Sequence, residues 1–301
     1  MVRSARRRSL GTALLSALLL AACSDGPPPA PIESTETPWT HLEFLDGPEV
    51  FHFAVVADRA GAHRPGVFQS ALGRLEALGP SFVISVGDLL DTSDFNRTPE
   101  LLTEEAAQDL WTEFDGMVDD LSMPFFFVGG NNDLRSDMLE DVWIRRFGRT
   151  YYHFRYQDVL FLVLNSEDPP GSPAGALSED QLAWLRRTLA QQEDVRWTFL
   201  FLHKPMWLLP DHPVWTAVEE ALGNRPRTAF GGHFHGYSRT EVNGQVYYGL
   251  ATTGGSSELL GVAEGQFDHV VWVTMTEEGP RISNLLLDGI WGDDPASEVG
   301  G

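Results

Sequence analysis

Short apolar runs alternate with helical patterns along most of the chain. Seven runs have the length of buried β-strands, and they lie at residues 51–57, 82–86, 125–128, 160–164, 198–202, 246–250 and 269–275. Continuous apolar runs of this length are typical of strands that are covered on both faces. The helical patterns between them predict an α/β domain in which helices pack on a largely parallel sheet.

Two helical patterns carry clear start signals. One is expected to begin at Thr98-Pro99-Glu100, where a capping residue, a first-turn proline and an acid follow one another. The other is expected after Ser178, because Gln181 completes a capping box. The inward stripes are predicted to be Leu102, Ala106, Leu110, Phe114 and Val118 in the first helix, and Leu182, Leu185 and Leu189 in the second.

The C-terminal part of the chain has a different pattern. Asn243-Gly244 separates two strand patterns and predicts a β-hairpin with a type I′ turn. No helical pattern stands between the last strands, so this half is expected to be more antiparallel.

The N-terminus has the features of an export signal. Arg3, Arg6, Arg7 and Arg8 precede an apolar stretch at residues 10–22, which is too short to span a bilayer. The sequence Leu20-Ala21-Ala22-Cys23 resembles a bacterial lipobox, in which the cysteine carries the lipid. We therefore expect an exported lipoprotein of the bacterial envelope that is held to the membrane through Cys23. An ordinary signal peptide or an uncleaved anchor with an incidental cysteine is the alternative.

These features suggest the domain organisation. We expect a signal peptide at 1–22, a lipidated cysteine and flexible linker at 23–45, one folded domain at 46–291, and a disordered tail at 292–301.

Charge and cysteine content exclude several classes of protein. The 301 residues include 43 acidic and 21 basic residues, which gives a formal net charge of −22. A protein that coats nucleic acid needs the opposite balance to neutralise phosphates. The single cysteine excludes an internal disulfide framework and a zinc finger built on thiolates.

Polar residues follow four of the apolar runs and a further strand pattern at residues 228–231. They are Asp58, Asp88, the segment Asn131 to Asp133, His203, and the pair His233 and His235. Ligands of α/β proteins bind at the carboxyl ends of the strands, so we expect these side chains to share one crevice. Carboxylates, imidazoles and an amide without a thiolate suit manganese, iron or zinc. Two such divalent ions can clamp a phosphoryl group and activate water.

The order Asp, Gly-Asp, Gly-Asn, His, Gly-His-x-His resembles the calcineurin-like metallophosphoesterase superfamily. The resemblance covers about residues 50–289, and segments such as 58–68 and 113–131 are similar to a bacterial subgroup. It implies a β-sandwich flanked by helices on both faces, a four-layer αββα fold. It also implies a metal-dependent phosphoesterase that hydrolyses a small phosphate monoester or diester.

The resemblance also implies roles for individual residues. Asp88 would bridge two metal ions, Asp58 and His235 would bind the first, and Asn131, His203 and His233 would bind the second. A hydroxide held between the metals would attack phosphorus in line.

The first departure from the family pattern concerns the first metal. Relatives usually have a histidine two residues after the first aspartate, where this chain has Ala60. Asp91 or His63 is available as a substitute ligand. We favour Asp91 and expect His63 to line the substrate cleft. A carboxylate in place of imidazole hardens the site and favours manganese.

The second departure concerns proton transfer. Asn132 occupies the position of a histidine that is thought to protonate the leaving group, while its expected partner Asp133 remains. Asparagine cannot deliver a proton, and general acid catalysis contributes about 10²–10⁴-fold. Arg59 or His63, from the loop after Asp58, is a possible substitute. We expect a weakened but active phosphoesterase, and the alternative is a pseudoenzyme that binds metal or a phosphate ligand.

Overall fold

The computed structural model describes residues 37–42, 50–96, 98, 101–287 and 289–291, which all belong to one compact unit. The predicted signal peptide, Cys23 and the tail at 292–301 lie outside the described residues.

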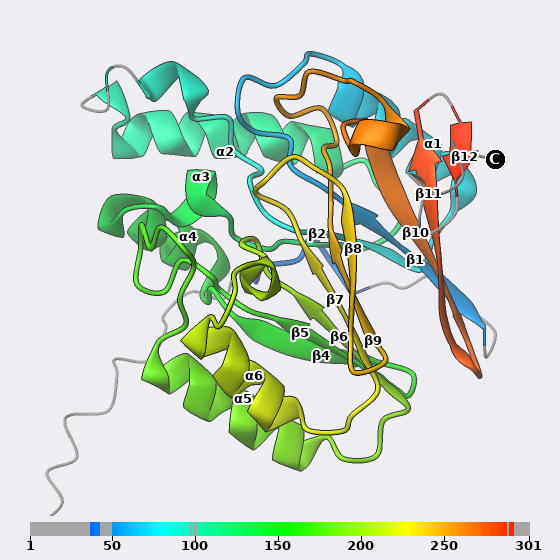
Figure 1. The fold of residues 1–301 in the computed structure, drawn as a ribbon. Coiled ribbons are helices and arrows are strands. Elements are labelled where there is room, and N and C mark those ends of the chain that lie inside the picture. Colours follow the sequence, from blue (N-terminus) through cyan, green and yellow to red (C-terminus); the bar gives the residue numbers. More distant parts are fainter. Residues whose placement is uncertain (1–36, 43–49, 97, 99–100, 288, 292–301) are drawn as a thin grey trace, which may run out of the picture. The chain divides into compact units, whose positions relative to one another are not determined.

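Two six-stranded sheets form the centre of this unit (Figure 1). The first has the strand order β12-β11-β10-β1-β2-β3, and the second has the order β4-β5-β6-β7-β9-β8. The strands of the first sheet are β1 (Phe51–Val56), β2 (Phe82–Ser85), β3 (Phe125–Phe126), β10 (His269–Thr276), β11 (Gly279–Leu286) and β12 (Gly289–Trp291). Those of the second are β4 (Tyr152–Tyr156), β5 (Val159–Val163), β6 (Trp197–Phe201), β7 (Arg227–Gly231), β8 (Ser238–Val242) and β9 (Gln245–Gly249).

Helices cover the outer face of each sheet. The helices are α1 (Val67–Leu78), α2 (Glu104–Val118), α3 (Asn131–Leu134), α4 (Asp137–Phe147), α5 (Glu179–Gln191) and α6 (Pro213–Leu222). Side chains of α1, α2 and α4 pack on the first sheet, and those of α5 and α6 pack on the second. In Figure 1, α2 lies above the sheets and α5 and α6 lie below them. The predicted four-layer αββα architecture is therefore confirmed.

Alternation along the strands separates the layers. In β1, Phe51, Phe53 and Val55 point into the core between the sheets, whereas Ala54 and Val56 face the helices. The ring of Phe53 stacks on Phe82 with a centroid distance of 5.1 Å. Because successive side chains of a strand point to opposite faces, one apolar run fills two cores. This explains why the strands were recognisable as continuous apolar runs.

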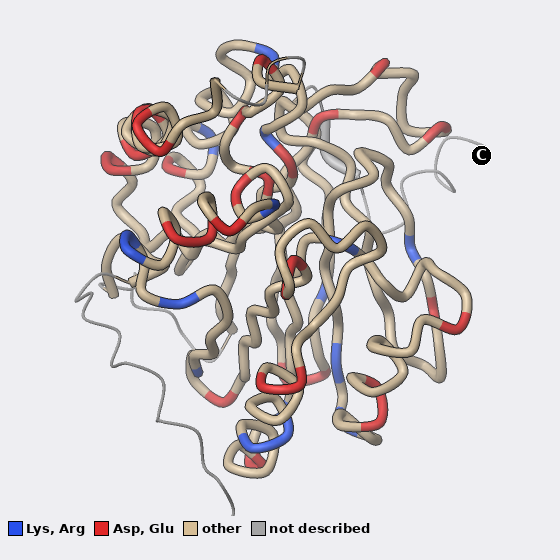
Figure 2. The backbone as a smooth tube through the Cα atoms, turned by 90° about the vertical axis from the view of Figure 1, so that its left-hand side faces the viewer, with Lys and Arg blue, Asp and Glu red and all other residues tan. Residues whose placement is uncertain are grey.

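Most acidic residues lie in the helices and loops around this framework. Figure 2 shows Asp and Glu distributed over helices and loops, with fewer Lys and Arg between them. Most of the excess negative charge is therefore solvated, which agrees with a net charge of −22 in a folded chain.

Helix α2 begins later than the sequence predicted. Thr103, not Thr98, is the N-cap, and its Oγ1 accepts a hydrogen bond from Ala106 N at 3.2 Å. Glu104 and Glu105 follow in the first turn, where the positive end of the helix dipole stabilises carboxylates. A capping threonine followed by two glutamates is a stronger signal for the start of a helix than the Thr-Pro-Glu sequence at residues 98–100.

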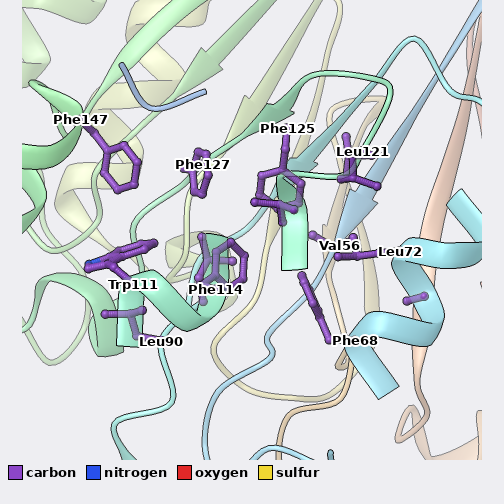
Figure 3. Close-up of a cluster of buried hydrophobic side chains, with 14 of the residues drawn as sticks. Val56, Phe68, Leu72, Leu90, Trp111, Phe114, Leu121, Phe125, Phe127 and Phe147 are labelled. Atoms are coloured by element: carbon purple, nitrogen blue, oxygen red, sulfur yellow. The ribbon is translucent and has the colours of Figure 1, made fainter. Parts of the chain in front are cut away.

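The buried face of α2 also differs from the predicted stripe. Ala107, Trp111, Phe114 and Val118 are buried, whereas Leu102 and Leu110 are only partly buried. Figure 3 shows the Trp111 and Phe114 rings among the aromatic side chains of this core. Phe114 and Val118 are therefore buried as predicted. A strict spacing of four drifts around a helix with 3.6 residues per turn, so the earlier members of the predicted stripe lie away from the core.

Helix α5 begins as predicted. Ser178 Oγ accepts a hydrogen bond from Gln181 N at 3.2 Å. The Gln181 side chain does not close a capping box. Its Oε1 accepts a hydrogen bond from Asn165 N at 2.8 Å, and its Nε2 donates to Asn165 O at 3.0 Å. Leu185 and Leu189 are buried as predicted, and Leu182 is partly buried.

The predicted hairpin is confirmed by β8 and β9, which pair antiparallel around Asn243 and Gly244. Both turn residues have positive φ, at 54° and 74°, as a type I′ turn requires. Strands β10, β11 and β12 are also antiparallel, as expected for this half.

The predicted linker extends too far into the folded domain. Phe127 N donates to Pro38 O at 2.8 Å, and Thr40 N donates to Phe125 O at 3.1 Å. Trp39 is partly buried and packs against Phe126, with a centroid distance of 6.1 Å. A flexible tether was expected here because the composition is polar. The backbone hydrogen bonds and the Trp39 ring together hold the segment along β3.

Candidate metal centre

The polar residues that follow the strands meet at one edge of the sandwich. Strands β1, β2 and β3 are parallel, so Asp58, Asp88 and Asn131 leave the first sheet at the same edge. Strands β6 and β7 of the second sheet are also parallel and lead to His203 and His233. Each half of the site is therefore supplied by a different sheet.

Glycines allow the two halves to approach closely. A Cβ on Gly232 would lie 2.0 Å from Asp58 Oδ1, and one on Gly130 would lie 2.4 Å from Asp88 Oδ1. Gly87 has φ of 96°, and a Cβ there would lie 2.8 Å from the backbone of Gly130. The side chains can converge only because these positions carry none.

The backbone of the site is strained at three residues that are not glycine. Asp88, His233 and His235 have φ of 55°, 74° and 53°. Left-handed conformations of such residues cost free energy and concentrate at functional sites. The strain supports a functional role for these three side chains.

Asp58, Asp88 and His203 form the centre of the cluster. One ligand atom from each lies within 4.8 Å of the others, and all three residues are buried. His203 Nε2 is 3.3 Å from Asp88 Oδ1 and 3.0 Å from Asn131 Oδ1. Burial opposes protonation of His203, but the carboxylates of Asp88, Asp58 and Glu167 outweigh it and raise its pKa. Four predicted ligands therefore converge.

The remaining two histidines flank this centre. His235 Nε2 is 3.1 Å from Asp58 Oδ2. Burial lowers the pKa of His235, but the hydrogen bond and charge of Asp58 outweigh it and raise the pKa to about 9. The ring centroid of His233 lies 5.1 Å from that of His203. Burial, followed by the charges of His203 and Lys204, lowers the pKa of His233 to about 4.

One buried carboxylate oxygen fits a cation. Asp58 Oδ1 has no hydrogen-bond partner, whereas Oδ2 accepts from His233 N at 2.9 Å. A buried charged oxygen without a partner is costly, and a bound cation would remove this cost. Carboxylate and imidazole donors in this arrangement suit a hard or borderline divalent ion.

Asn132 is held by a hydrogen-bond network of its own. Its Nδ2 donates to Asp88 Oδ2 at 2.7 Å, and its backbone N donates to Asp88 Oδ1 at 2.8 Å. Its Oδ1 accepts a hydrogen bond from Thr92 Oγ1. The amide therefore orients the carboxylate that is expected to bridge the metals. Thr92 was not predicted, because nothing in the sequence indicates where its hydroxyl points.

Asp133 is not the partner of the Asn132 side chain, contrary to the sequence prediction. It accepts hydrogen bonds from the backbone N–H groups of Leu90 and Gly130 at 2.9 and 2.8 Å, and from Leu89. Burial and the charge of Asp88 raise its pKa to about 7. Asp133 thus fixes the loop after β2 against α3 and is fully buried.

Asp91 and His63 contact each other, although the sequence offered them as alternative ligands. His63 Nδ1 lies 2.6 Å from Asp91 Oδ2, and His63 N donates to the same oxygen at 2.7 Å. Burial opposes ionisation of Asp91, but hydrogen bonds from Ser93 and His63 outweigh it and hold its pKa well below the usual range. Neither residue belongs to the cluster of three ligand atoms around Asp88.

Arg59 does not reach the cleft, so the structure does not support its predicted action on the substrate. The residue is 1% exposed, donates to Leu89 O at 2.9 Å and pairs with Glu113 Oε1 at 2.5 Å. Its guanidinium points toward Glu113 on α2 and the Leu89 carbonyl in the loop after β2, which both accept its hydrogen bonds.

A buried ion pair beside the site was also missed. Lys204, the only lysine of the chain, lies 2.7 Å from Glu167 Oε1, and its Nζ donates to Ser172 O at 2.6 Å. Burial raises the pKa of Glu167, and Lys204 partly opposes this. The pair fixes the loop after β5 next to His203. Only the position of Lys204 after a strand pointed to it.

Comparison with known families gives a match over most of the domain. The model of a family described as Calcineurin-like phosphoesterase matches residues 51–237. Proteins named Serine/threonine-protein phosphatase CPPED1 are 29% identical over 135 residues in Pongo abelii and 31% identical over 138 residues in Mus musculus. These alignments cover 43% of this chain and 41% of each relative, so they span less than half of either protein.

Solved structures share the fold. A dimetal phosphatase from Danio rerio has a TM-score of 0.55 and 17% identity, with 81% of this chain and 96% of that chain covered. GAP50, titled the anchor in the inner membrane complex of Plasmodium, has a TM-score of 0.51 and 12% identity, with 79% and 84% covered.

The close approach of Gly232 to the Asp58 carboxylate leads to a prediction. Gly232→Ala should displace the Asp58 carboxylate, because the new Cβ would lie 2.0 Å from Oδ1. We expect the Kd for Mn²⁺, measured by calorimetry, to rise by about tenfold or more. Gly116→Ala is the matched control, since a Cβ there meets nothing within 4 Å. Equal Mn²⁺ affinity in the two variants would show that Asp58 does not bind metal.

Proposed function

The chain belongs to the calcineurin-like phosphoesterase family, and from this premise we propose that it is a metal-dependent phosphoric ester hydrolase. The convergence of Asp58, Asp88 and His203, with their ligand atoms within 4.8 Å, is the observation that carries the proposal. The unpartnered Asp58 Oδ1 adds a place for a cation.

Six residues would hold two divalent ions, with Asp88 between them. The others are Asp58, Asn131, His203, His233 and His235, and their carboxylate, amide and imidazole donors suit a hard or borderline divalent ion such as manganese. When bound, such ions supply Lewis acidity toward phosphoryl oxygens and make water nucleophilic at neutral pH. The protein orients Asp88 through Asn132 and fixes His203 through a hydrogen bond between Nδ1 and Val86 O at 3.0 Å. A rigid set of ligands lowers the cost of reorganisation during the reaction.

The proposed substrate is a small phosphate ester. The acidic surface repels anions at long range, so binding depends on local positive charge at the site. The partial match to proteins named serine/threonine-protein phosphatases makes phosphoserine and phosphothreonine peptides candidates beside simple monoesters and diesters.

His63 is the proposed source of the proton that Asn132 cannot deliver. Asp91 accepts hydrogen bonds only, so the 2.6 Å contact places a proton on His63 Nδ1 and fixes the ring. The side chain of His63 is 33% exposed, whereas that of Asp91 is 9% exposed. This is the arrangement of a general acid that a buried carboxylate orients.

Asn132 is also the reason to consider a second function. Its amide binds Asp88 and accepts from Thr92, so no acid occupies the position next to the bridging carboxylate. If His63 does not replace that acid, the site would bind metal or phosphate as a pseudoenzyme.

We also propose that Cys23 carries a lipid and holds the enzyme at the bacterial envelope. The basic and apolar N-terminus with its lipobox-like end supports this. Among the described residues, no helix has both the length and the apolarity to cross a membrane.

Removal of the bridging carboxylate tests the proposed activity. In the full-length chain with Mn²⁺, Asp88→Asn should reduce hydrolysis of 4-nitrophenyl phosphate and bis(4-nitrophenyl) phosphate by about 100-fold or more. The exposed Asp94→Asn is the control, because it removes the same charge without touching the site. Metal-loaded wild type that hydrolyses neither substrate, with activity appearing in Asn132→His, would instead establish the pseudoenzyme.

The proton donor is tested with leaving groups of different quality. His63→Gln should lower kcat by about 100-fold for phenyl phosphate but much less for 4-nitrophenyl phosphate, whose leaving group needs no proton. His153→Gln on β4 is the control. If bound manganese falls in His63→Gln, His63 is a ligand and not an acid. An equal loss with both substrates also contradicts the proposal.

Lipid attachment is tested by metabolic labelling in a bacterial host. Labelled palmitate should appear in the wild type and in Ser24→Ala, and it should be absent from Cys23→Ser, which should leave the membrane fraction. An unlabelled wild type would contradict the anchor.

A further inference from the structure

Arg135 lies next to the metal centre, and none of the described carboxylates forms an ion pair with it. It follows α3, the short helix that carries Asn131 and Asn132, and its side chain is half-buried. Arg135 NH1 donates to Asn132 Oδ1 at 3.5 Å and to Asn96 Oδ1 at 3.4 Å. Among the described residues, no carboxylate lies within ion-pair distance of this guanidinium.

This lack of an acidic partner is informative in so acidic a chain. Arg59 pairs with Glu113 at 2.5 Å and Arg64 pairs with Asp268 at 2.7 Å, whereas Arg135 has only two long hydrogen bonds to neutral amides. Weak contacts of this kind are easily exchanged for charge-assisted bonds to an anion. Within the described part of the chain, Arg135 is therefore a cation that is held in place but not neutralised.

Asn132 connects Arg135 to the proposed reaction centre. The same amide accepts from Arg135 through Oδ1 and donates through Nδ2 to Asp88 Oδ2 at 2.7 Å. One side-chain amide thus separates the guanidinium from the carboxylate expected to bridge two metals. An anion bound over Asp88 would meet the guanidinium at the edge of the site.

We propose that Arg135 is the residue that binds the phosphoryl group of the substrate beside the metal centre, which rests on the proposed phosphoesterase function. The guanidinium presents N–H donors in a planar fork that matches two phosphate oxygens. A guanidinium carries a fixed positive charge, so it can stabilise negative charge but does not act as a proton donor in catalysis. Its attraction is strongest for a dianionic monoester, and it supplies the local positive charge that the acidic surface lacks.

The experiment compares Arg135→Gln with wild type in the full-length, manganese-loaded chain. Calorimetry with inorganic phosphate should show a Kd raised by about tenfold or more in the variant. The kcat/KM for 4-nitrophenyl phosphate should fall by a similar factor, and by less for the monoanionic bis(4-nitrophenyl) phosphate. Manganese stoichiometry should not change. Arg135→Lys should restore part of the phosphate affinity, because the charge returns without the fork.

Arg145→Gln on α4 is the matched control. Arg145 is 52% exposed and pairs with Glu104, so its loss removes the same charge outside the site. Unchanged phosphate affinity in Arg135→Gln, or an equal change in Arg145→Gln, would overturn the proposal. So would a loss of bound manganese in Arg135→Gln, which would mean that Arg135 only supports Asn132. A wild type that binds phosphate through Arg135 but hydrolyses nothing would refute the proposed function and leave this inference intact.

Discussion

Three carboxylates, Asp58, Asp88 and Asp133, are buried at one edge of the sandwich, and the surrounding structure depends on how their charge is balanced. Like charges in a buried site repel one another, and each also loses its hydration. Asp133 receives three backbone N–H groups and has a pKa raised to about 7. Asp58 and Asp88 lie against His235 and His203. Asp58 Oδ1 remains without a partner, which is the state a cation would complete.

The need to balance these buried charges explains both the glycines and the positive φ angles at the site. The glycines at 87, 130 and 232 are needed because carboxylates and imidazoles from two sheets must approach within hydrogen-bonding distance. The positive φ of Asp88, His233 and His235 has the same origin, since an ordinary backbone would carry these side chains away from the centre. Local strain is thus offset by electrostatic attraction at the same point.

The replacement of a histidine by Asn132 changes the network around this centre. An amide has a donor and an acceptor, and here the donor binds Asp88 while the acceptor meets Thr92 and Arg135. Asp91, three residues beyond Asp88, is left to orient His63. Under the proposed roles of His63 and Arg135, two tasks that one imidazole can combine, the delivery of a proton and the stabilisation of charge, would fall to separate residues.

Much of the fold was predictable because its strands are buried on both faces. Apolar runs such as 160–164 and 198–202 matched β5 and β6 to within one residue. Strand β11 was missed because its eight residues mix Pro280, Arg281 and Asn284 with apolar positions. Site positions were predictable because polar residues follow parallel strands. The orientations of Arg59, Asp91 and Asp133 were not, because each depends on backbone groups that only the tertiary structure brings near.

The segment Pro38 to Thr40 has a consequence for how the molecule meets its own copies. Strand β3 ends the first sheet, and the edge strand of a sheet offers unpaired backbone groups to any other chain. Here Pro38 O and Thr40 N already bond to Phe127 N and Phe125 O, and Trp39 covers Phe126. The segment occupies backbone groups of this edge strand and so blocks the addition of a strand from another chain. A chain that lacked it would expose an unpaired edge and tend to aggregate.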